Sequence, residues 1–392
     1  MTATEQAQPA PPRGTRPTNR RALIIAAAAR LFHDLGYPNV GMGDIADAVN
    51  VRPSALYRHF SGKDELFAAA AHAALEPVRA AVAEPGEFDA LVRALAAAAI
   101  GQRAIGVLWQ REARHLPDEA RKRLRAELSG TAHLLAERIG RRRPELDAAQ
   151  ADLLSWSALS ALGSISFHRI QLPAARLQEL MHEILHRIVH APIPGLGAAA
   201  PRPRGRGLAL HSRREQILAE AARLFADNGS SSVTIDDIGE AVGIAGPSIY
   251  TSFASKQEIL TAALNRGNEW LWTEASRALA AAADEQDALE RMLRAYLGLA
   301  GERGEYIAVL IIDRDQLPEA EQHRIRRAQH EFITEWVELL RAVQPGLGAD
   351  PARIQVQAAL MIVNDLTRTP HLRDLSGFED AVFAVARCLL GP

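Results

Sequence analysis

DIADAVNVRPSALYRHFSGK, residues 44–63, recurs 193 positions later as DIGEAVGIAGPSIYTSFASK, residues 237–256. The Asp, Ile, Ala, Val, Tyr, Phe and Lys of the first stretch return at the same spacing in the second. The match continues upstream without a gap, from residues 30–40 to residues 223–233. A register kept over this length indicates that the chain is a tandem repeat.

The distal part of the chain is duplicated as well. Leu116-Pro117 returns as Leu317-Pro318, and Pro144 returns as Pro345, at an offset of 201. Between the copies lies a Pro-, Gly- and Arg-rich linker of ~20 residues, which spans up to ~65 Å when extended and is expected to restrict the two units little. The predicted boundaries are 1–18 for a disordered basic arm, 19–66 and 212–259 for the first domain of each copy, 67–191 and 260–392 for the larger domain that follows it, and 192–211 for the linker.

Composition narrows the class of protein. A chain of 392 residues is long for one core and suggests more than one domain. The net charge of −2 means that any nucleic-acid surface must be local. Cys388 is the single cysteine, which excludes an intramolecular disulfide and a cysteine-based zinc finger. We find no signal-peptide pattern, and residues 153–167, the longest uncharged apolar-leaning run, are too short to span a bilayer, so we expect cytoplasmic localisation and no membrane contact.

The periodicity predicts an all-α fold. Ile24, Ala28, Leu31 and Leu35 form one stripe of an amphipathic helix that Gly36 ends. Short helices are expected from about Met42 to Val49 and from Pro53 through Tyr57, and a long helix is expected from Lys63. The remainder of each copy consists of Ala/Leu/Arg-rich helical segments separated by Pro and Gly.

Two short helices joined by a turn form a helix-turn-helix, whose second helix enters the major groove of DNA. In the first copy the buried side is expected to be Ile45, Ala48, Val49, Val51, Leu56 and Phe60. The side facing DNA is then Arg52, Ser54, Ala55, Tyr57, Arg58 and His59. Arginine suits guanine edges and phosphates, and an exposed Tyr hydroxyl suits a phosphate oxygen. Lys63 opens the next helix, where the backbone amides also favour a phosphate.

The pattern Ala-Ala-Arg-Leu-Phe…Gly…Asp-Ile-Ala…Leu-Tyr-Arg-His-Phe…Lys-Asp-Glu-Leu resembles the DNA-binding domain of the TetR family of bacterial transcription regulators. The resemblance covers residues 20–67 and again 213–260. It implies an all-α unit with three N-terminal DNA-binding helices, middle helices around an apolar effector pocket, and two last helices that form a four-helix dimer interface. It also implies repression that a small molecule relieves, with no catalysis and no cofactor. Here the two units are expected to pair with each other, or two whole chains to form a homodimer.

The copies differ from the family pattern in opposite ways. Copy 1 has Gly41, Asn50 and Arg52 where the family commonly has Thr, Gly and a Ser or Thr cap, whereas copy 2 keeps Thr234 and Gly243. The DNA-facing residues predicted in copy 2 are Thr234, Ala245, Ser248, Tyr250, Thr251 and Lys256.

The local charge differs between the copies as well. Residues 13–63 hold 8 Lys/Arg and 3 Asp, net +5, whereas residues 202–256 hold 7 Lys/Arg and 6 Asp/Glu, net +1. Because phosphate neutralisation supplies most non-specific affinity, copy 1 is predicted to bind DNA more strongly. The alternative is that both copies bind DNA and that uncharged groups suffice in copy 2.

A basic arm precedes each copy, with Arg13 and Arg16 before the first and Arg204 and Arg206 before the second. Arginines in such arms bind narrow A·T minor grooves, and the second arm is similar to an AT-hook. The alternative is a solvated, arginine-rich linker.

Candidate effector contacts are the aromatic and isolated polar groups of the middle helices, with plain core packing as the alternative. We expect a hydrophobic or amphipathic effector, and the proposed contacts are Trp109, Trp156, Phe167, His168, Tyr306 and Trp336.

One motif points to a different function. His182-Glu183-Ile184-Leu185-His186 fits H-E-x-x-H, the pattern of a zinc-dependent enzyme. No third ligand is evident and copy 2 lacks the motif, so we expect no metal site.

The sequence thus predicts a DNA-binding regulator, most simply a repressor that binds double-stranded DNA operators in the nucleoid. The alternatives are an interaction protein with degenerate DNA-binding domains and the zinc-dependent enzyme.

Overall fold

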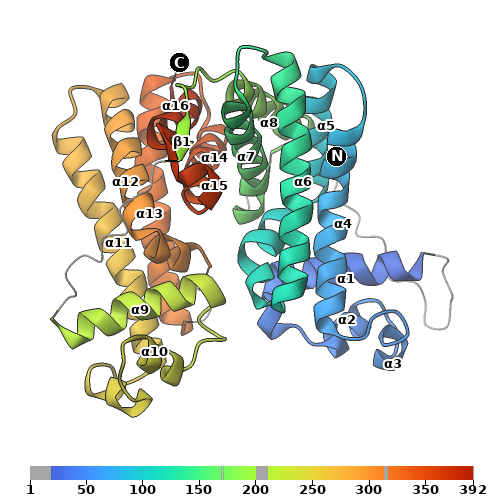
Figure 1. The fold of residues 1–392 in the computed structure, drawn as a ribbon, viewed down its shortest axis with the longest axis vertical. Coiled ribbons are helices and arrows are strands. Elements are labelled where there is room, and N and C mark those ends of the chain that lie inside the picture. The colour runs from blue at the N-terminus through green and yellow to red at the C-terminus, as the bar shows by residue number, and fades with distance from the viewer. Residues whose placement is uncertain (1–18, 169, 171, 200–210, 313–316, 392) are drawn as a thin grey trace.

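The computed structural model describes residues 19–168, 170, 172–199, 211–312 and 317–391, and these form an almost wholly helical molecule of two side-by-side units (Figure 1). This confirms the all-α prediction with two tandem units. The first unit runs through α1 (Arg20–Leu35), η1 (Tyr37–Asn39), α2 (Met42–Ala48), α3 (Pro53–Leu56), α4 (Lys63–Ala83), α5 (Phe88–Gly101), η2 (Val107–Glu112), η3 (Ala113–His115), α6 (Asp118–Arg142), α7 (Ala148–Ser164), η4 (Ile165–Phe167) and α8 (Ala174–Val189).

A short strand, β1 (Gly197–Ala199), leads from the first unit toward the second. The second unit runs through α9 (Arg213–Asn228), α10 (Ile235–Ala241), η5 (Gly246–Thr251), α11 (Lys256–Ala280), α12 (Glu285–Ile312), α13 (Glu319–Val343), α14 (Ala349–Thr367), α15 (Pro370–Arg373), β2 (Leu375–Ser376) and α16 (Phe378–Leu390). We call α1–α3 head 1 and α9–η5 head 2, and we call α4–α8 body 1 and α11–α16 body 2.

The first helix shows how the sequence pattern becomes packing. Ile24, Ala28 and Phe32 of α1 are fully buried, and Phe32 meets the ring of Phe67 of α4 edge-on. Leu31 is only half-buried and Leu35 is 52% exposed, so the buried stripe runs through Phe32 instead of the predicted Leu31 and Leu35.

Helix α4 also has a periodic buried face, which runs along its whole length in body 1. Its buried residues recur every three or four positions, from Leu66 to Val82, and pack against α1, α5 and α6. Among the described helices, α4 is also the one whose length and composition would suit a membrane span. Because its apolar side forms the core between these helices, that composition is explained by packing.

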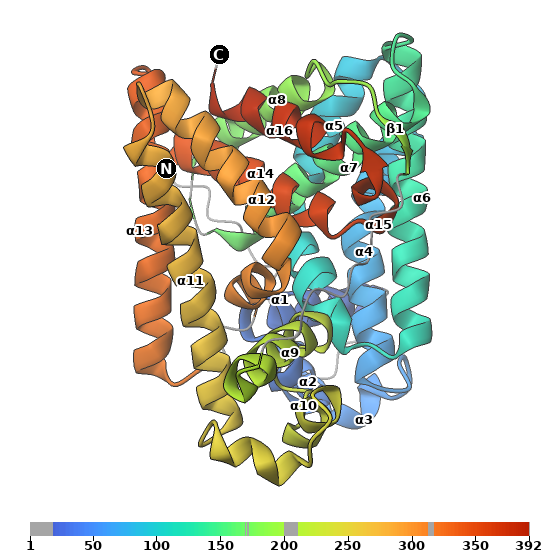
Figure 2. The ribbon, with the colours of Figure 1, turned by 60° about the vertical axis from the view of Figure 1, so that its left-hand side comes forward.

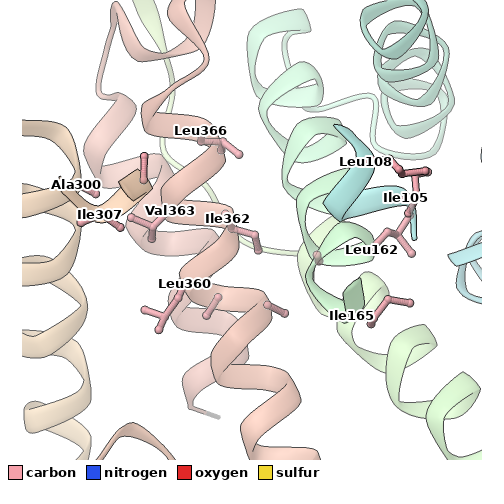
Figure 3. Close-up of a cluster of buried hydrophobic side chains, with 14 of the residues drawn as sticks. Ile105, Leu108, Leu162, Ile165, Ala300, Ile307, Leu360, Ile362, Val363 and Leu366 are labelled. Carbon is pink, nitrogen blue, oxygen red and sulfur yellow. The ribbon is translucent and has the colours of Figure 1, made fainter. Parts of the chain in front are cut away.

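The two bodies meet through four helices, where α7 and α8 of body 1 pack on α14 and α16 of body 2 (Figures 1 and 2). Figure 3 shows Ile362 and Leu366 pointing from α14 toward α7. Ala158 and Ala161 of α7 are fully buried, and such small residues allow close helix contact.

Polar contacts also cross this junction between the bodies. Arg187 of α8 donates to the Cys388 carbonyl at 3.4 Å, and His371 Nε2 lies 2.9 Å from Asp152 Oδ2. As Figure 1 shows, the pairing brings head 1 and head 2 to the same end of the molecule.

The start of the linker is more ordered than predicted. Gly197 and Ala199 pair antiparallel with Ser376 and Leu375, which joins the linker to the loop before α16. Gln150 of α7 also donates to the carbonyls of Ile193 and Pro194. The prediction that this segment restricts the units little is therefore wrong for residues 192–199, because its free backbone groups find partners on both bodies.

Candidate DNA-binding heads and effector cavities

Head 1 has the geometry of a helix-turn-helix. Ile45, Val49, Leu56 and Phe60 are buried between α2 and α3, as predicted. Val51 is half-buried, and Ala48 is exposed. Its neighbour Ala46 is buried instead, which corrects the predicted inner face of α2 by two positions.

The predicted DNA-facing residues of head 1 lie on its surface. Tyr57 is 56% exposed, which is unusual for a large aromatic ring, and the adjacent guanidinium and imidazole groups are exposed too. Ala55 is half-buried, so it contributes less of this face than predicted. The exposed residues of the predicted set are Arg52, Ser54, Tyr57, Arg58 and His59.

Head 2 presents the corresponding residues on a tighter turn. Its second element is a 3₁₀ helix, η5, which follows the close approach of Gly239 in α10 to Gly246. A Cβ on Gly239 would lie 2.8 Å from the Ile244 carbonyl oxygen and 3.0 Å from the Gly246 nitrogen. Ala245, Ser248, Tyr250 and Thr251 are exposed, with Tyr250 at 55%. The face they form carries no formal charge.

The predicted Thr234 acts within the protein. Its hydroxyl accepts a hydrogen bond from the Asp237 amide at 3.1 Å and donates to Asp237 Oδ2 at 2.7 Å, so it caps α10. The Thr234 backbone amide donates to the same Asp237 oxygen at 2.7 Å, and this bond first, and the hydroxyl bond second, hold the pKa of Asp237 below its usual value. In head 1 the corresponding Gly41 has no side chain, and only its amide donates to Asp44, at 2.7 Å.

The two heads share one internal frame. The guanidinium of Arg21 lies 4.9 Å from the centre of the Phe60 ring, and that of Arg214 lies 3.9 Å from the Phe253 ring. In both heads a glutamate in the first turn of the following helix accepts a hydrogen bond from a backbone amide just before that helix. Glu65 Oε2 accepts from the Ser61 amide at 2.6 Å, and Glu258 Oε2 accepts from the Ala254 amide at 2.7 Å. These contacts place the recognition element against the first helix in both copies.

The two lysines predicted to contact phosphate are partly engaged inside their heads. The ammonium of Lys63 lies 4.1 Å from the centre of the Tyr37 ring, and desolvation lowers its pKa. Lys256 Nζ donates to the carbonyls of Ser230 and Val233, both at 2.8 Å. Each lysine therefore ties the loop before the helix-turn-helix to the following long helix and has less capacity left for a phosphate. The predicted arm residues Arg13, Arg16, Arg204 and Arg206 lie outside the described residues.

A cavity of about 300 Å³, cavity 1, lies between the units and is large enough for a small molecule. Its walls come from body 1, from α9 of head 2 and from the end of α14 of body 2. Its lining residues are Leu75, Val78, Ile105, Gly106, Trp109, Gln110, Ala113, Arg114, Arg121, Leu124, Arg125, Leu128, Trp156, Leu159, Ser160, Leu162, Gly163, Ala226, Asp227, Asp365, Arg368 and Thr369.

A second cavity of about 310 Å³, cavity 2, lies mainly in body 2. Its lining residues are Ser164, Phe167, Asn268, Leu271, Tyr296, Ile307, Leu310, Ile311, Arg326, Gln329, His330, Phe332, Ile333, Arg353, Gln357, Leu360, Met361 and Asn364. Tyr296 donates to Asn364 Oδ1 at 2.9 Å, and burial raises its pKa.

Three of the six predicted effector contacts line these cavities. Trp109 and Trp156 line cavity 1, and Phe167 lines cavity 2 although it belongs to the first unit. His168, Tyr306 and Trp336 line neither cavity.

The other three predicted contacts are buried, and Tyr306 and Trp336 take part in core packing. Tyr306 packs edge-on against Trp270, with the ring centres 4.8 Å apart, and the fully buried Trp336 packs against Phe332. Burial and the charge of Arg103 lower the pKa of His168 to about 4. For Tyr306 and Trp336 these contacts favour the alternative of plain core packing. The charged residues of cavity 1 were not predicted.

The η2–η3 segment connects cavity 1 with both heads. Trp109 and Gln110 face the cavity, whereas the neighbouring Glu112 is buried and accepts from the Tyr37 amide of head 1 at 2.6 Å. Arg111 donates to the His33 carbonyl at the end of α1, at 3.1 Å.

On the other side, Arg114 donates to the Phe225 carbonyl in α9 of head 2, at 3.3 Å. One short segment thus contacts cavity 1, head 1 and head 2.

The H-E-x-x-H motif has an ordinary surface role. His182 Nε2 lies 2.9 Å from Asp89 Oδ1, and the rings of His186 and His190 stack with centres 4.1 Å apart. Within the described residues no group of three or more His, Cys, Asp or Glu side chains is placed to hold a metal ion.

Comparison with known proteins follows the same division into two units. The sequence model of the family described as "Bacterial regulatory proteins, tetR family" matches residues 24–70 and 217–263. The HTH-type transcriptional activator FasR of Mycolicibacterium smegmatis is 28% identical over 165 residues, which cover 42% of this chain and 75% of FasR. The HTH-type transcriptional repressor KstR2 of Mycobacterium tuberculosis is 38% identical over 63 residues, which cover 16% of this chain and only 32% of KstR2.

Among solved structures, a TetR-family transcriptional regulator from Bordetella parapertussis 12822 aligns with a TM-score of 0.43 and 22% identity, over 46% of this chain and 96% of that chain.

Two helix-turn-helix heads on helical bodies, with these relatives, define a DNA-binding transcriptional regulator. The chain belongs to the TetR family and carries two TetR-type units fused in tandem.

Proposed function

We propose that the chain is a repressor that binds one operator in the cytoplasmic nucleoid as an intramolecular pseudo-dimer and leaves it when a small amphipathic effector binds. The observation that carries this proposal is the packing of α7 and α8 on α14 and α16, with both heads at one end of the molecule (Figure 1). Because the outer faces of the heads differ, the operator would be asymmetric, with two unlike half-sites about 34 Å apart.

The η2–η3 segment supplies a route for regulation. A ligand against Trp109 and Gln110 would shift the segment that holds Glu112 against head 1 and Arg114 against head 2. Such a shift changes the spacing of the heads, and a protein held to two successive major grooves tolerates little change in spacing. We propose no catalytic role, because the similar proteins are named as transcription regulators.

The test is DNA binding by the purified chain, with the DNA upstream of its own gene as probe and a shuffled sequence as control. Light scattering of the complex gives the number of chains per site. One chain on two unlike half-sites supports the pseudo-dimer. Two chains per site would instead mean that whole chains dimerise, and loss of selectivity against the shuffled DNA would refute the regulator proposal.

A further inference from the structure

Each cavity is lined in part by a helix end from the opposite unit, and the two helix ends correspond to each other in the repeat. Cavity 2 of the second unit is closed by Ser164 and Phe167 at the end of α7 in the first unit. Cavity 1 is closed by the residues 201 positions later, Asp365 and Arg368, near the end of α14. The same structural position therefore supplies a hydroxyl and an apolar ring to one cavity, and a carboxylate and a guanidinium to the other.

Cations outnumber carboxylates along the wall of cavity 1. Arg114, Arg121, Arg125 and Arg368 line it, against Asp227 and Asp365. Arg121 already bonds to Asp118. Within the part of the chain that the structure describes, the guanidinium groups of Arg125 and Arg368 make no hydrogen bond or close ion pair.

Arg368 lines cavity 1 and is exposed to solvent. Desolvation and the nearby charges of Arg114 and Arg125 lower its pKa, which the closeness of Asp365 and Asp227 only partly offsets. A guanidinium without a close partner favours an anion beside it.

Asp365 accepts a hydrogen bond from the first unit. Gln110 of η2 donates to Asp365 Oδ2 at 2.6 Å, across the junction between the units. Burial raises the pKa of Asp365 to about 6, although a hydrogen bond with Ser160 and the charge of Arg368 act in the opposite direction. The carboxylate that competes with a bound anion thus loses its charge in mildly acidic solution.

Much of the remaining lining of cavity 1 is apolar, although Gln110, Ser160 and Thr369 also line it. Trp109 and Trp156 are half-buried and turn part of their rings to the cavity, beside Leu75, Val78, Leu124 and Leu128. A cavity lined by both apolar side chains and arginines fits a ligand with an apolar body and one acidic end.

We propose that cavity 1 binds an amphipathic organic anion whose carboxylate or phosphate lies between Arg125 and Arg368 and whose apolar part lies against Trp109 and Trp156. The ligand would then touch both units and α9 of head 2, through Ala226 and Asp227. This identifies the ligand class of the regulator proposed above, and its regulatory meaning rests on that function.

The test is calorimetric titration of the whole chain with four ten-carbon probes: decanoate, decyl phosphate, decanol and decylamine. Decanoate or decyl phosphate should bind at least about tenfold more tightly than decanol, and decylamine more weakly still. The stronger of the two anions identifies the headgroup. Equal binding of decanol and both anions would overturn the proposal.

Variants then assign the site. Arg368→Gln and Arg125→Gln should each weaken binding of the preferred anion about tenfold. The matched control is Arg326→Gln, because Arg326 corresponds to Arg125 at an offset of 201 and lines cavity 2. An effect of Arg326→Gln as large as that of Arg368→Gln would move the site to cavity 2.

The Asp365→Asn variant gives a second test of the site, in which no arginine is removed. Asp365→Asn should tighten anion binding and remove its pH dependence, whereas in the unmodified chain affinity should rise as the pH falls from 8 through about 6. A constant affinity of decanesulfonate over this range would contradict the role of Asp365.

Direct ligand binding separates this proposal from the regulator proposal. Binding of the anion without binding of any operator would support the ligand site and refute the regulator proposal. Binding of the operator without binding of any of the anions would support the regulator proposal and refute the ligand site.

Discussion

Head 1 and head 2 have kept the same interior and changed the face turned outward. The stacking of arginine on the Phe60 and Phe253 rings, and the glutamate that closes the following helix start, are present in both. By contrast, Arg52 and Arg58 of head 1 correspond to Ala245 and Thr251 of head 2. Interior contacts are constrained by packing on every side, whereas the outer face is constrained only by its partner. The difference shows that the heads share internal contacts but present different side chains on their outer faces.

The bodies differ in the same way. The packing of α7 on α14 keeps corresponding helices in contact, while the ends of those helices carry different chemistry, Ser164 and Phe167 in one and Asp365 and Arg368 in the other. Each cavity takes part of its wall from the opposite unit, so a substitution in one unit alters the lining of the cavity in the other.

The largest expected effect comes from giving head 1 the outer face of head 2. Arg52→Ala with Arg58→Thr should weaken operator binding about 100-fold, because each arginine that pairs with a base edge contributes ~1–3 kcal/mol. If both contact phosphates instead, the salt dependence of log K should become shallower by about 2. Fluorescence anisotropy over a range of salt concentrations measures both.

The reciprocal change sharpens the comparison. Ala245→Arg with Thr251→Arg should raise affinity for any DNA about tenfold and steepen the salt dependence, without improving selectivity.

Unchanged DNA binding after the head 1 substitutions Arg52→Ala and Arg58→Thr would show that the exposed face of head 1 does not contact DNA.

A smaller effect is expected from the turn geometry that separates the heads. Gly239→Ala places a Cβ against backbone atoms of residues 244 and 246, and overpacking of this kind costs about 1–3 kcal/mol. Hydrogen exchange should then rise across α10 and η5 and stay unchanged in α2 and α3.

The control is Ala46→Gly at the corresponding position of head 1, where Ala46 is fully buried in a more open turn. It should cost about 1 kcal/mol through helix propensity alone. Equal losses in both heads would mean that the close approach of α10 to η5 is not important for stability.

Much of this molecule could be predicted from its sequence. The repeat register fixed the two-unit organisation, and the helical period placed Ile45, Leu56 and Phe60 inside head 1. Tyr57 and Arg58 directly follow α3 and are exposed, as predicted, although the predicted helix extended through Tyr57 and the observed one ends at Leu56.

The cavities could not be predicted in the same way. Asp365 and Arg368 meet Trp109 and Arg125 only after α14 packs on the first unit, and no local pattern encodes that contact. A signal was present in the comparison of the copies, since an acid and a base replace Ser164 and Phe167 at the offset of 201. Trp336 and Tyr306 show the opposite failure, because aromatic residues fill a core as readily as they line a ligand site.

The smallest expected effect concerns the helix caps, which differ between the heads. Thr234→Ala should destabilise head 2 by about 1 kcal/mol, and Gly41→Thr should stabilise head 1 by a few tenths. Because the bonds from Thr234 lower the pKa of Asp237 in the folded state, the stability they contribute is present above the unfolded carboxyl value of about 4 and is lost as the pH falls through the lower folded value.

The difference in unfolding free energy between Thr234→Ala and the unmodified chain, measured in urea with hydrogen exchange as the local probe, should therefore shrink in acid. A difference that stays constant from pH 7 to pH 3 would show that the threonine acts through packing and not through its bonds to Asp237. The Gly41→Thr variant then tests whether head 1 has the same capping geometry. Its Asp44 already accepts from the Gly41 amide, so an added hydroxyl has its acceptor in place, and a loss of stability would mean that the two helix starts differ in backbone shape as well as in side chain.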